Sequence, residues 1–435
     1  MRSFKKSAAA VLGLSLMAAG CSNSSSGGSG DSTELSIFST ITTESEKQAL
    51  EELIEKFEEE NEGIQIDMNF PGPDYESLMR TKMAANDMPD LFDTHGWAKT
   101  RYKDYVADLS EEEWSGNIDE AMDPVLRDEE GKLYAMPLNQ AKDGISYNAT
   151  LLEEYGIEPP ETFAEFEEAL ATIEEKGKGE VTPLWMTADE AGSIQQYFDQ
   201  MATPLLVTDE ENNHEESLMD GTFDWSNYTL LPEKLKEFQE KGYLNEDLLT
   251  AGGDQATSLM AQNQIGFIFA SGAFGADVTK LAEDVKVGLI PVPAVHEGDD
   301  PSWIGGERHT LALNEESENP EEAKAFLEFM AEEENAKAIA EATSLPSAFQ
   351  EVESENYYSE YFDAYAEIEV EPYFDRVYLP SGMWDVFKTT GEELLSNTLT
   401  PNQVSTEMES EYLRLREEVG VEEGESIEEA EEPEE

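Results

Sequence analysis

The chain has 435 residues, and its 27 lysines and arginines against 98 aspartates and glutamates give a formal net charge of −71. A surface this negative repels phosphate groups, so binding to nucleic acid or to an anionic lipid surface is not expected. With 39% hydrophobic and 9% aromatic residues, the chain can still form packed cores. Its length predicts two or three domains, or one body of two lobes.

The first 20 residues have the composition of a secretory signal. Three basic residues precede an uncharged apolar stretch, Ala8–Ala19, which is too short to span a bilayer. Cys21, the only cysteine, follows small residues and resembles the lipobox of bacterial lipoproteins, although Ala18 stands where leucine is commoner. We therefore expect cleavage after residue 20, a diacylglyceryl group with palmitate-type chains on Cys21, and a flexible Ser/Gly tether through residues 21–32. An ordinary signal followed by a chance cysteine is the alternative.

The rest of the chain predicts alternating strands and helices. Hydrophobic residues alternate with polar ones over 35–37 and 64–70, and between these strands the residues 50–57 carry apolar side chains at helical spacing. Further short strands are expected at Leu91–Phe92, Leu133–Met136, Gly144–Tyr147, Val181–Trp185, Ile265–Phe269 and Val285–Ile290. This alternation predicts an α/β fold with mostly parallel sheets flanked by helices.

Several boundaries can be read from local chemistry. Thr162 and Glu165 have the spacing of a capping box at the start of a helix. Asn319 before Pro320 predicts a second helix start, with the asparagine as the capping residue. The last residues are rich in glutamate and have no apolar period, so a disordered acidic tail is expected over 419–435.

Seven short segments follow one another in an order that is typical of one family. They are Met88–Phe92, Gly131–Pro137, Tyr147–Asn148, Pro159–Phe163, Gly288–Pro293, Gly305–Gly306 and Asn319–Ala323. Each segment is weak evidence alone, but together they extend over most of the chain behind the predicted signal. In this order the chain resembles the family 1 extracellular solute-binding proteins, the carbohydrate-binding lipoproteins of ABC importers, which include maltose-binding proteins.

The resemblance implies a two-lobed periplasmic-binding-protein-like fold of type II, with hinge strands between the lobes. One lobe would contain residues 33–142 and 294–345, and the other would contain residues 143–293 and 346–418. Ligands of open α/β sheets bind beyond the carboxyl ends of the strands, which agrees with a sugar site between the lobes. The resemblance further implies a monomer that closes on its ligand and delivers it to a membrane permease, held by its lipid at the outer face of the cytoplasmic membrane.

Aromatic side chains are the first candidates for the site, because sugars present apolar ring faces edged with hydroxyl groups. His95 and Trp97 lie in the loop after the strand at residues 91–92. Phe274 and Trp384 occupy contexts in which the maltose-binding relatives have stacking aromatics. Two further tryptophans are weaker candidates, Trp185 and Trp303. The plainer interpretation of any tryptophan is a place in a core.

Polar candidates complete the predicted site. Asp143 stands at the expected lobe crossing and Glu44 follows the first strand, so both could accept hydrogen bonds from sugar hydroxyl groups. Gly305 and Gly306 could let a ligand approach the backbone. The plainer interpretation of each carboxylate, among so many, is a solvated surface position.

Other chemistries find little support in the sequence. The four histidines have no metal-ligand spacing, and no P-loop, nucleophile elbow or dinucleotide fingerprint is present. A partial calcium loop at Asp209 has His214 where glycine is needed and Asp220 where glutamate is needed. We therefore expect no metal, no cofactor and no catalysis.

Two alternatives remain open, a secreted glycosidase that uses a carboxylate pair and a purely structural acidic surface protein. Incubation with oligosaccharides separates them from a binding protein, which gives saturable heat without product. The acidic residues gather on outer helix faces such as Glu51–Glu60. Their position suggests adaptation to a saline or alkaline habitat, because molar salt screens self-repulsion.

Overall fold

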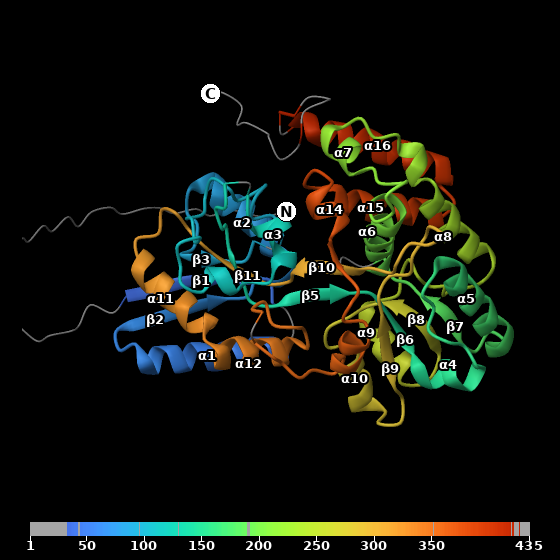
Figure 1. Ribbon diagram of the computed structural model, residues 1–435, viewed down its shortest axis with the longest axis horizontal. Coiled ribbons are helices and arrows are strands. Elements are labelled where there is room, and N and C mark those ends of the chain that lie inside the picture. The colour runs from blue at the N-terminus through green and yellow to red at the C-terminus, as the bar shows by residue number, and fades with distance from the viewer. Residues whose placement is uncertain are drawn as a thin grey trace, which may run out of the picture.

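Two α/β bodies lie side by side, and the strands β5 (Gln140–Asp143) and β10 (Trp303–Glu307) run between them (Figure 1). The computed structural model describes residues 33–41, 44–94, 96–128, 130–188, 192–350, 352–418, 420–421 and 426. Within these ranges, no helix combines the length and the apolar character that crossing a bilayer requires. The predicted signal, Cys21 and the tether lie outside the described residues, as does most of the predicted acidic tail.

The first lobe is built on a five-stranded sheet with the order β2-β1-β3-β11-β4. Its strands are β1 (Thr33–Phe38), β2 (Ile64–Asn69), β3 (Leu91–Phe92), β4 (Met136–Pro137) and β11 (Thr310–Leu313). Strand β1 pairs in parallel with β2 and β3, whereas β11 is antiparallel to β3 and β4. This lobe therefore begins with the predicted β-α-β unit and closes with a strand that returns from the junction.

Helices cover this sheet and bury apolar stripes against it. They are α1 (Glu44–Glu60), α2 (Tyr75–Ala85), α3 (Asp123–Leu126), α11 (Pro320–Ala331) and α12 (Glu333–Thr343), with short 3-10 turns η1 (Gly72–Asp74), η2 (Ser115–Asn117) and η3 (Glu120–Met122). Phe57 of α1 meets the rings of Phe326 and Phe329 edge-on, with centroids 5.1 and 5.3 Å away. The apolar face that the spacing predicted in α1 is thus the face that joins the core.

The second lobe has a four-stranded sheet with the order β7-β8-β6-β9. Its strands are β6 (Ile145–Asn148), β7 (Thr182–Trp185), β8 (Ile265–Phe269) and β9 (Val287–Ile290). Its helices are α4 (Ala149–Tyr155), α5 (Phe163–Gly177), α6 (Ser193–Leu206), α7 (Glu215–Asp220), α8 (Leu230–Glu240), α9 (Gly253–Met260), α10 (Phe274–Leu281), α13 (Ser359–Ala364), α14 (Phe374–Val377), α15 (Met383–Leu395) and α16 (Pro401–Glu418), with the 3-10 turn η4 (Trp225–Tyr228). The capping box of Thr162 and Glu165 at the start of α5 is confirmed.

A third sheet with the order β12-β10-β5 joins the lobes, and its edge strand is β12 (Val370–Pro372). Strand β10 runs antiparallel to β5 and parallel to β12. The chain therefore crosses between the lobes along β5 and again along β10, and β12 pairs with β10 at the edge of this small sheet. A Cβ on Gly305 would lie 1.9 Å from the carbonyl oxygen of Ala141 in β5, so close strand packing explains this glycine.

Two local predictions need correction. The sheets of the two lobes are mixed and not mostly parallel. Strands β6 and β11 each follow a hinge strand and enter their sheets from the junction, so β6 is antiparallel to β8 and β9, and β11 is antiparallel to β3. Asn319 precedes α11 but makes no side-chain capping bond, since its amide turns toward the carboxylate of Asp90 at 3.5 Å. The lobe boundaries stay a prediction. Ala348 and Phe349 pack in the core of the first lobe, although they lie beyond the predicted boundary at residue 345.

Candidate ligand site at the lobe junction

Asp93, directly after β3, ties together loops at the first lobe's edge of the junction. Its buried carboxylate accepts hydrogen bonds from the backbone N–H and the hydroxyl of Thr310, at 3.2 and 2.9 Å, and from the hydroxyl of Thr40. Its Oδ2 also lies 3.3 Å from Nδ1 of His309. The loops after β1 and β3 and the start of β11 are therefore held in one place, which fixes the base of the Trp97 loop.

Trp97 is half-buried in this loop and lies beside two arginines. The guanidinium carbon of Arg101 is 4.3 Å from the indole centroid, and that of Arg376 is 5.9 Å from it. Arg101 forms an ion pair with Glu76 of the same lobe and donates to the hydroxyl of Ser381 at 2.8 Å. Since Ser381 lies two residues before the start of α15, this bond brings the Trp97 loop next to the second lobe.

Trp384 and Phe274 lie at helix starts in the second lobe. Trp384 is in the first turn of α15, half-buried, with its ring 6.5 Å from that of Phe387. Phe274 is the first residue of α10 and is also half-buried. A Cβ on Gly272 would come within 3.7 Å of the Thr343 carbonyl at the end of α12, so the loop before Phe274 approaches the first lobe. Both aromatics thus lie on segments that reach the junction.

Asp143 is the centre of a hydrogen-bond network that links all three hinge strands. The Nη2 of Arg308, after β10, donates to both carboxylate oxygens at 2.7 and 2.8 Å. The hydroxyl of Tyr373, after β12, donates to Oδ2 at 2.6 Å, and the hydroxyl of Ser271 donates to Oδ1. Burial opposes the charge of Arg308, but the Asp143 carboxylate raises the pKa of the guanidinium. Asp143 thus uses its acceptors within the hinge.

A second ion pair at the junction joins Arg376 of α14 to Glu307 at the end of β10. The Nη1 of Arg376 donates to Oε1 of Glu307 at 2.6 Å and to its backbone carbonyl at 3.0 Å. The glutamate side chain is completely buried, and its Oε2 has no hydrogen-bond partner among the described residues. Burial raises the pKa of Glu307, while the charge of Arg376 opposes this rise.

Two aspartates meet in the second lobe beside Arg376. The backbone N–H of Asp375 donates to Oδ1 of Asp199 on α6 at 2.8 Å, and both carboxyl groups are buried. Burial and the charge of Asp375 raise the pKa of Asp199 well above its usual range. The folded state therefore keeps a proton on Asp199 at a pH at which the unfolded chain has lost it.

The substitution Asp199→Asn should remove part of the pH dependence of folding. A group whose pKa is raised by folding stabilises the native state below its unfolded pKa, and this contribution is lost as pH rises through the folded pKa. Asparagine mimics the protonated acid, because its oxygen can still accept from Asp375 and its amide can donate. We expect the free energy of unfolding of the variant to increase relative to that of wild type as pH rises above about 4.

Urea denaturation at several pH values, with the exposed Asp363→Asn as a control, measures this difference. A constant gap between Asp199→Asn and wild type from acid to neutral pH would show that Asp199 is already ionised in the folded protein.

The other predicted site residues are placed differently. Trp303 is completely buried and packs edge-on against Phe362, with centroids 5.4 Å apart. Trp185, 4% exposed, lies in the same core, and its indole nitrogen has no partner among the described residues. Glu44 begins α1, and His95 lies outside the described residues. The structure brings Trp97 and the start of α15 together, but Trp303 and Trp185 are core residues.

The sequence interpretation missed three arginines at the junction, Arg101, Arg308 and Arg376. They are three of only eight arginines in a chain with a net charge of −71. Their rarity was a usable signal, because in so acidic a chain each of the few arginines is a candidate for a specific ion pair. Arg101 could also have been found from its place four residues after Trp97. The pairing partners could not, since Arg308 and Asp143 are 165 residues apart.

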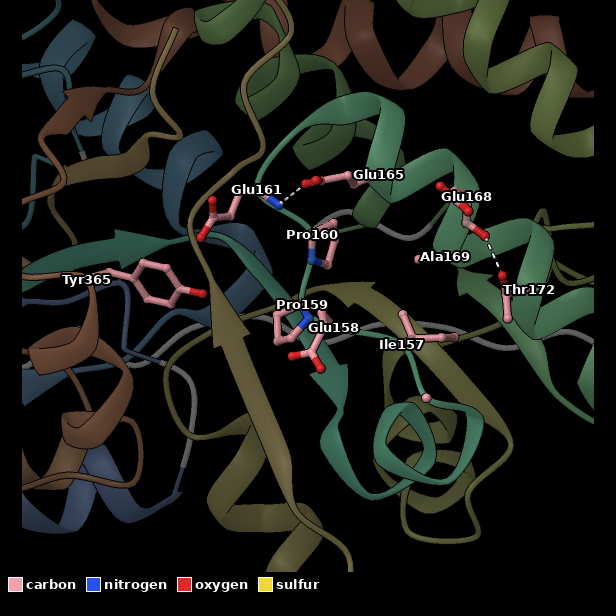
Figure 2. A pocket seen from close by; sticks show the side chains of 11 residues that line it. Ile157, Glu158, Pro159, Pro160, Glu161, Glu165, Glu168, Ala169, Thr172 and Tyr365 are labelled. Carbon is pink, nitrogen blue, oxygen red and sulfur yellow. Dashed lines mark hydrogen bonds between the residues drawn. The ribbon is translucent and has the colours of Figure 1, made fainter. Parts of the chain in front are cut away.

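A hollow of about 470 Å³ lies away from the junction, between the end of α4 and the start of α5 (Figure 2). Four glutamates line it, and Glu165 among them is already used in the capping box. Among the described residues, no three histidine, cysteine or acidic side chains are placed to hold a metal ion. We assign no ligand to this hollow.

Two α/β lobes joined by a three-stranded hinge sheet, with aromatic and polar side chains of both lobes at the junction, define a two-lobed solute receptor. The sequence pattern of the bacterial extracellular solute-binding proteins matches residues 42–337, and the chain belongs to this family. It is therefore an extracellular binding protein and not an enzyme, as predicted, and the glycosidase alternative gains no support.

Individual relatives are similar over nearly the whole chain. The melibiose/raffinose/stachyose-binding protein MelE of Bacillus subtilis (strain 168) is 48% identical over 402 residues, which are 92% of this chain and 94% of MelE. A crystal structure of a sugar transporter protein from Bacillus licheniformis in complex with stachyose is 56% identical, with a TM-score of 0.81 over 88% of this chain and 100% of that one. A putative binding protein from B. subtilis, in an open conformation, is 49% identical, with a TM-score of 0.84 over 89% of this chain and 98% of that one.

Proposed function

We propose that the protein binds a neutral oligosaccharide of the melibiose, raffinose and stachyose type between its lobes and delivers it to the membrane permease of an ABC importer. The observation that carries this proposal is the pairing of the arginines at the junction. Each of its three arginines is paired with a carboxylate: Arg101 with Glu76, Arg308 with Asp143 and Arg376 with Glu307. A junction whose arginines already have carboxylate partners offers little to an anionic ligand and suits an uncharged, hydroxyl-rich one.

The identity of the sugar is proposed from the relatives. MelE is named for melibiose, raffinose and stachyose, and the B. licheniformis protein was crystallised with stachyose. Stacking on Trp97, Phe274 and Trp384 would hold the sugar rings, because half-buried aromatics on junction segments offer apolar faces. Four further residues stay predicted contacts of the sugar: Gly305, Gly306, Glu44 and Asp143.

Isothermal titration calorimetry with melibiose, raffinose, stachyose and maltose tests the proposal. We expect saturable heat with one or more of the first three sugars, weaker binding of maltose, and no release of monosaccharide on long incubation. No heat with any of the three would contradict the proposed ligand. Gel filtration of the same samples tests the proposed monomer.

We also propose that Cys21 anchors the protein to the outer face of the cytoplasmic membrane. The support is the sequence of residues 1–21, in which a basic start, an apolar stretch and small residues precede the cysteine. Replacing Cys21 by Ala should release the protein from membranes into the medium, measured by fractionation of cells that express the full chain. A variant that stays with the membrane would contradict the anchor.

The acidic surface is proposed as an adaptation to salt or alkali and not as binding chemistry. Carboxylates that face solvent repel one another in dilute buffer, and about 1 M salt shortens the screening length to roughly 3 Å. The Tm should therefore rise between dilute buffer and molar NaCl, measured by thermal unfolding. A Tm that does not rise would remove this explanation.

A further inference from the structure

The Trp97 loop is packed tightly against the ion pair of Arg376 and Glu307. A Cβ on Gly96 would lie 2.4 Å from Cδ of Arg376 and 2.8 Å from Oε1 of Glu307, so the glycine allows the loop to approach both. Gly96 also has a φ of +86°, which glycine adopts without strain. The backbone next to Trp97 is therefore shaped by this pair.

The two partners come from opposite sides of the junction. Glu307 ends β10, and the side chains near it include Asp93 of the first lobe and Arg308. Arg376 lies in α14. Phe374 at the start of this helix and Tyr378 directly after it are in the core of the second lobe. The α14 helix itself packs against α6 of the second lobe and α3 of the first. Separating the lobes would pull the guanidinium from the carboxylate.

The pair is costly to break, because both side chains are removed from water. The Glu307 side chain is 0% exposed and that of Arg376 is 8% exposed. A buried ion pair adds little net stability against apolar residues of the same shape, yet the loss of one partner leaves an uncompensated buried charge. Arg376 also stacks on Tyr373, with its guanidinium carbon 4.1 Å from the ring centroid, which keeps it in one position.

We propose that Arg376 and Glu307 form a clasp across the lobe junction that positions the Trp97 loop and slows release of the bound sugar. This proposal rests on the proposed function, because the bound sugar is the ligand proposed there. Both are positioning residues, because they act through Gly96 and Trp97. Their effect should fall on dissociation, since association begins with the lobes apart and the clasp forms when they are together.

The test is the double variant Arg376→Met with Glu307→Gln. It removes both charges of the pair at once, so that neither partner is left without the other, and methionine keeps an unbranched apolar side chain beside Gly96. Stopped-flow fluorescence with stachyose should show a dissociation rate about tenfold higher and an association rate within about twofold of wild type, with the urea midpoint little changed. Arg414→Met is the matched control, because it breaks only exposed pairs with Glu411 and Glu418 on α16.

An unchanged dissociation rate in the folded double variant would overturn the clasp, and so would an equal increase in Arg414→Met. If the double variant does not fold, Glu307→Gln alone should still raise the dissociation rate several-fold, and an unchanged rate there would overturn the clasp.

Failure of the proposed ligand is a separate outcome, seen when wild type does not bind stachyose. Hydrogen exchange then tests the clasp without ligand. The peptide that carries Trp97 and Arg101 should exchange faster in the double variant than in wild type, with α16 unchanged, and equal exchange would overturn the proposal.

Discussion

Replacing Trp97 by Ala should weaken the binding of stachyose by about 2–4 kcal/mol, which corresponds to a dissociation constant roughly 30- to 1,000-fold higher. A half-buried indole at the junction offers a broad apolar face, and stacking on such a face supplies much of the affinity of an aromatic anchor. Arg101 lies 4.3 Å from the ring centroid and helps to fix its position. The fold should be affected much less, because Trp97 is only half-buried.

Calorimetry with stachyose and urea denaturation of the same preparation separate the two effects. Trp384→Ala should give a similar loss if that ring is the anchor of the second lobe. The core variant Trp303→Phe provides the contrast, since its position in a buried cluster predicts lost stability with retained affinity. A folded Trp97→Ala protein with the affinity of wild type would remove Trp97 from the site.

Local patterns in the sequence predicted the elements and missed what depends on the assembled lobes. Apolar spacing located α1, and the strand at residues 265–269 was predicted with the bounds of β8. The antiparallel entry of β6 and β11 could not be predicted, because strand direction depends on where the chain returns from the other lobe.

The candidate site shows the same division. Trp97 could be named as a candidate because its loop follows a strand that the sequence predicts, and Trp384 because its context resembles that of the maltose-binding relatives; both stay predicted site residues. Trp303 is also a tryptophan and lies near the Gly305–Gly306 pair, but it is completely buried. The difference lies in packing against Phe362, which is 59 residues away in the sequence and has no local signature.

Asp143→Asn should destabilise the protein by about 3–5 kcal/mol, because it removes a buried carboxylate on which three donors converge. Arg308, Tyr373 and Ser271 all donate to the two oxygens of Asp143, whose side chain is 6% exposed. An amide has a single oxygen, and its NH₂ group would face a donor that no longer has an acceptor. The guanidinium of Arg308 would also lose its counter-charge at the hinge.

Urea denaturation at fixed ionic strength measures the loss, and two variants calibrate it. Tyr373→Phe removes a single donor and should cost about 1 kcal/mol, whereas the exposed Asp363→Asn should stay within about 0.5 kcal/mol of wild type. Stachyose binding measured on the same proteins distinguishes the two roles of Asp143. If Asp143→Asn is as stable as wild type but no longer binds the sugar, the carboxylate contacts ligand and does not hold the hinge. If it is destabilised and binds with near-native affinity under folding conditions, Asp143 ties together the ends of β5, β10 and β12, on which closure of the lobes depends.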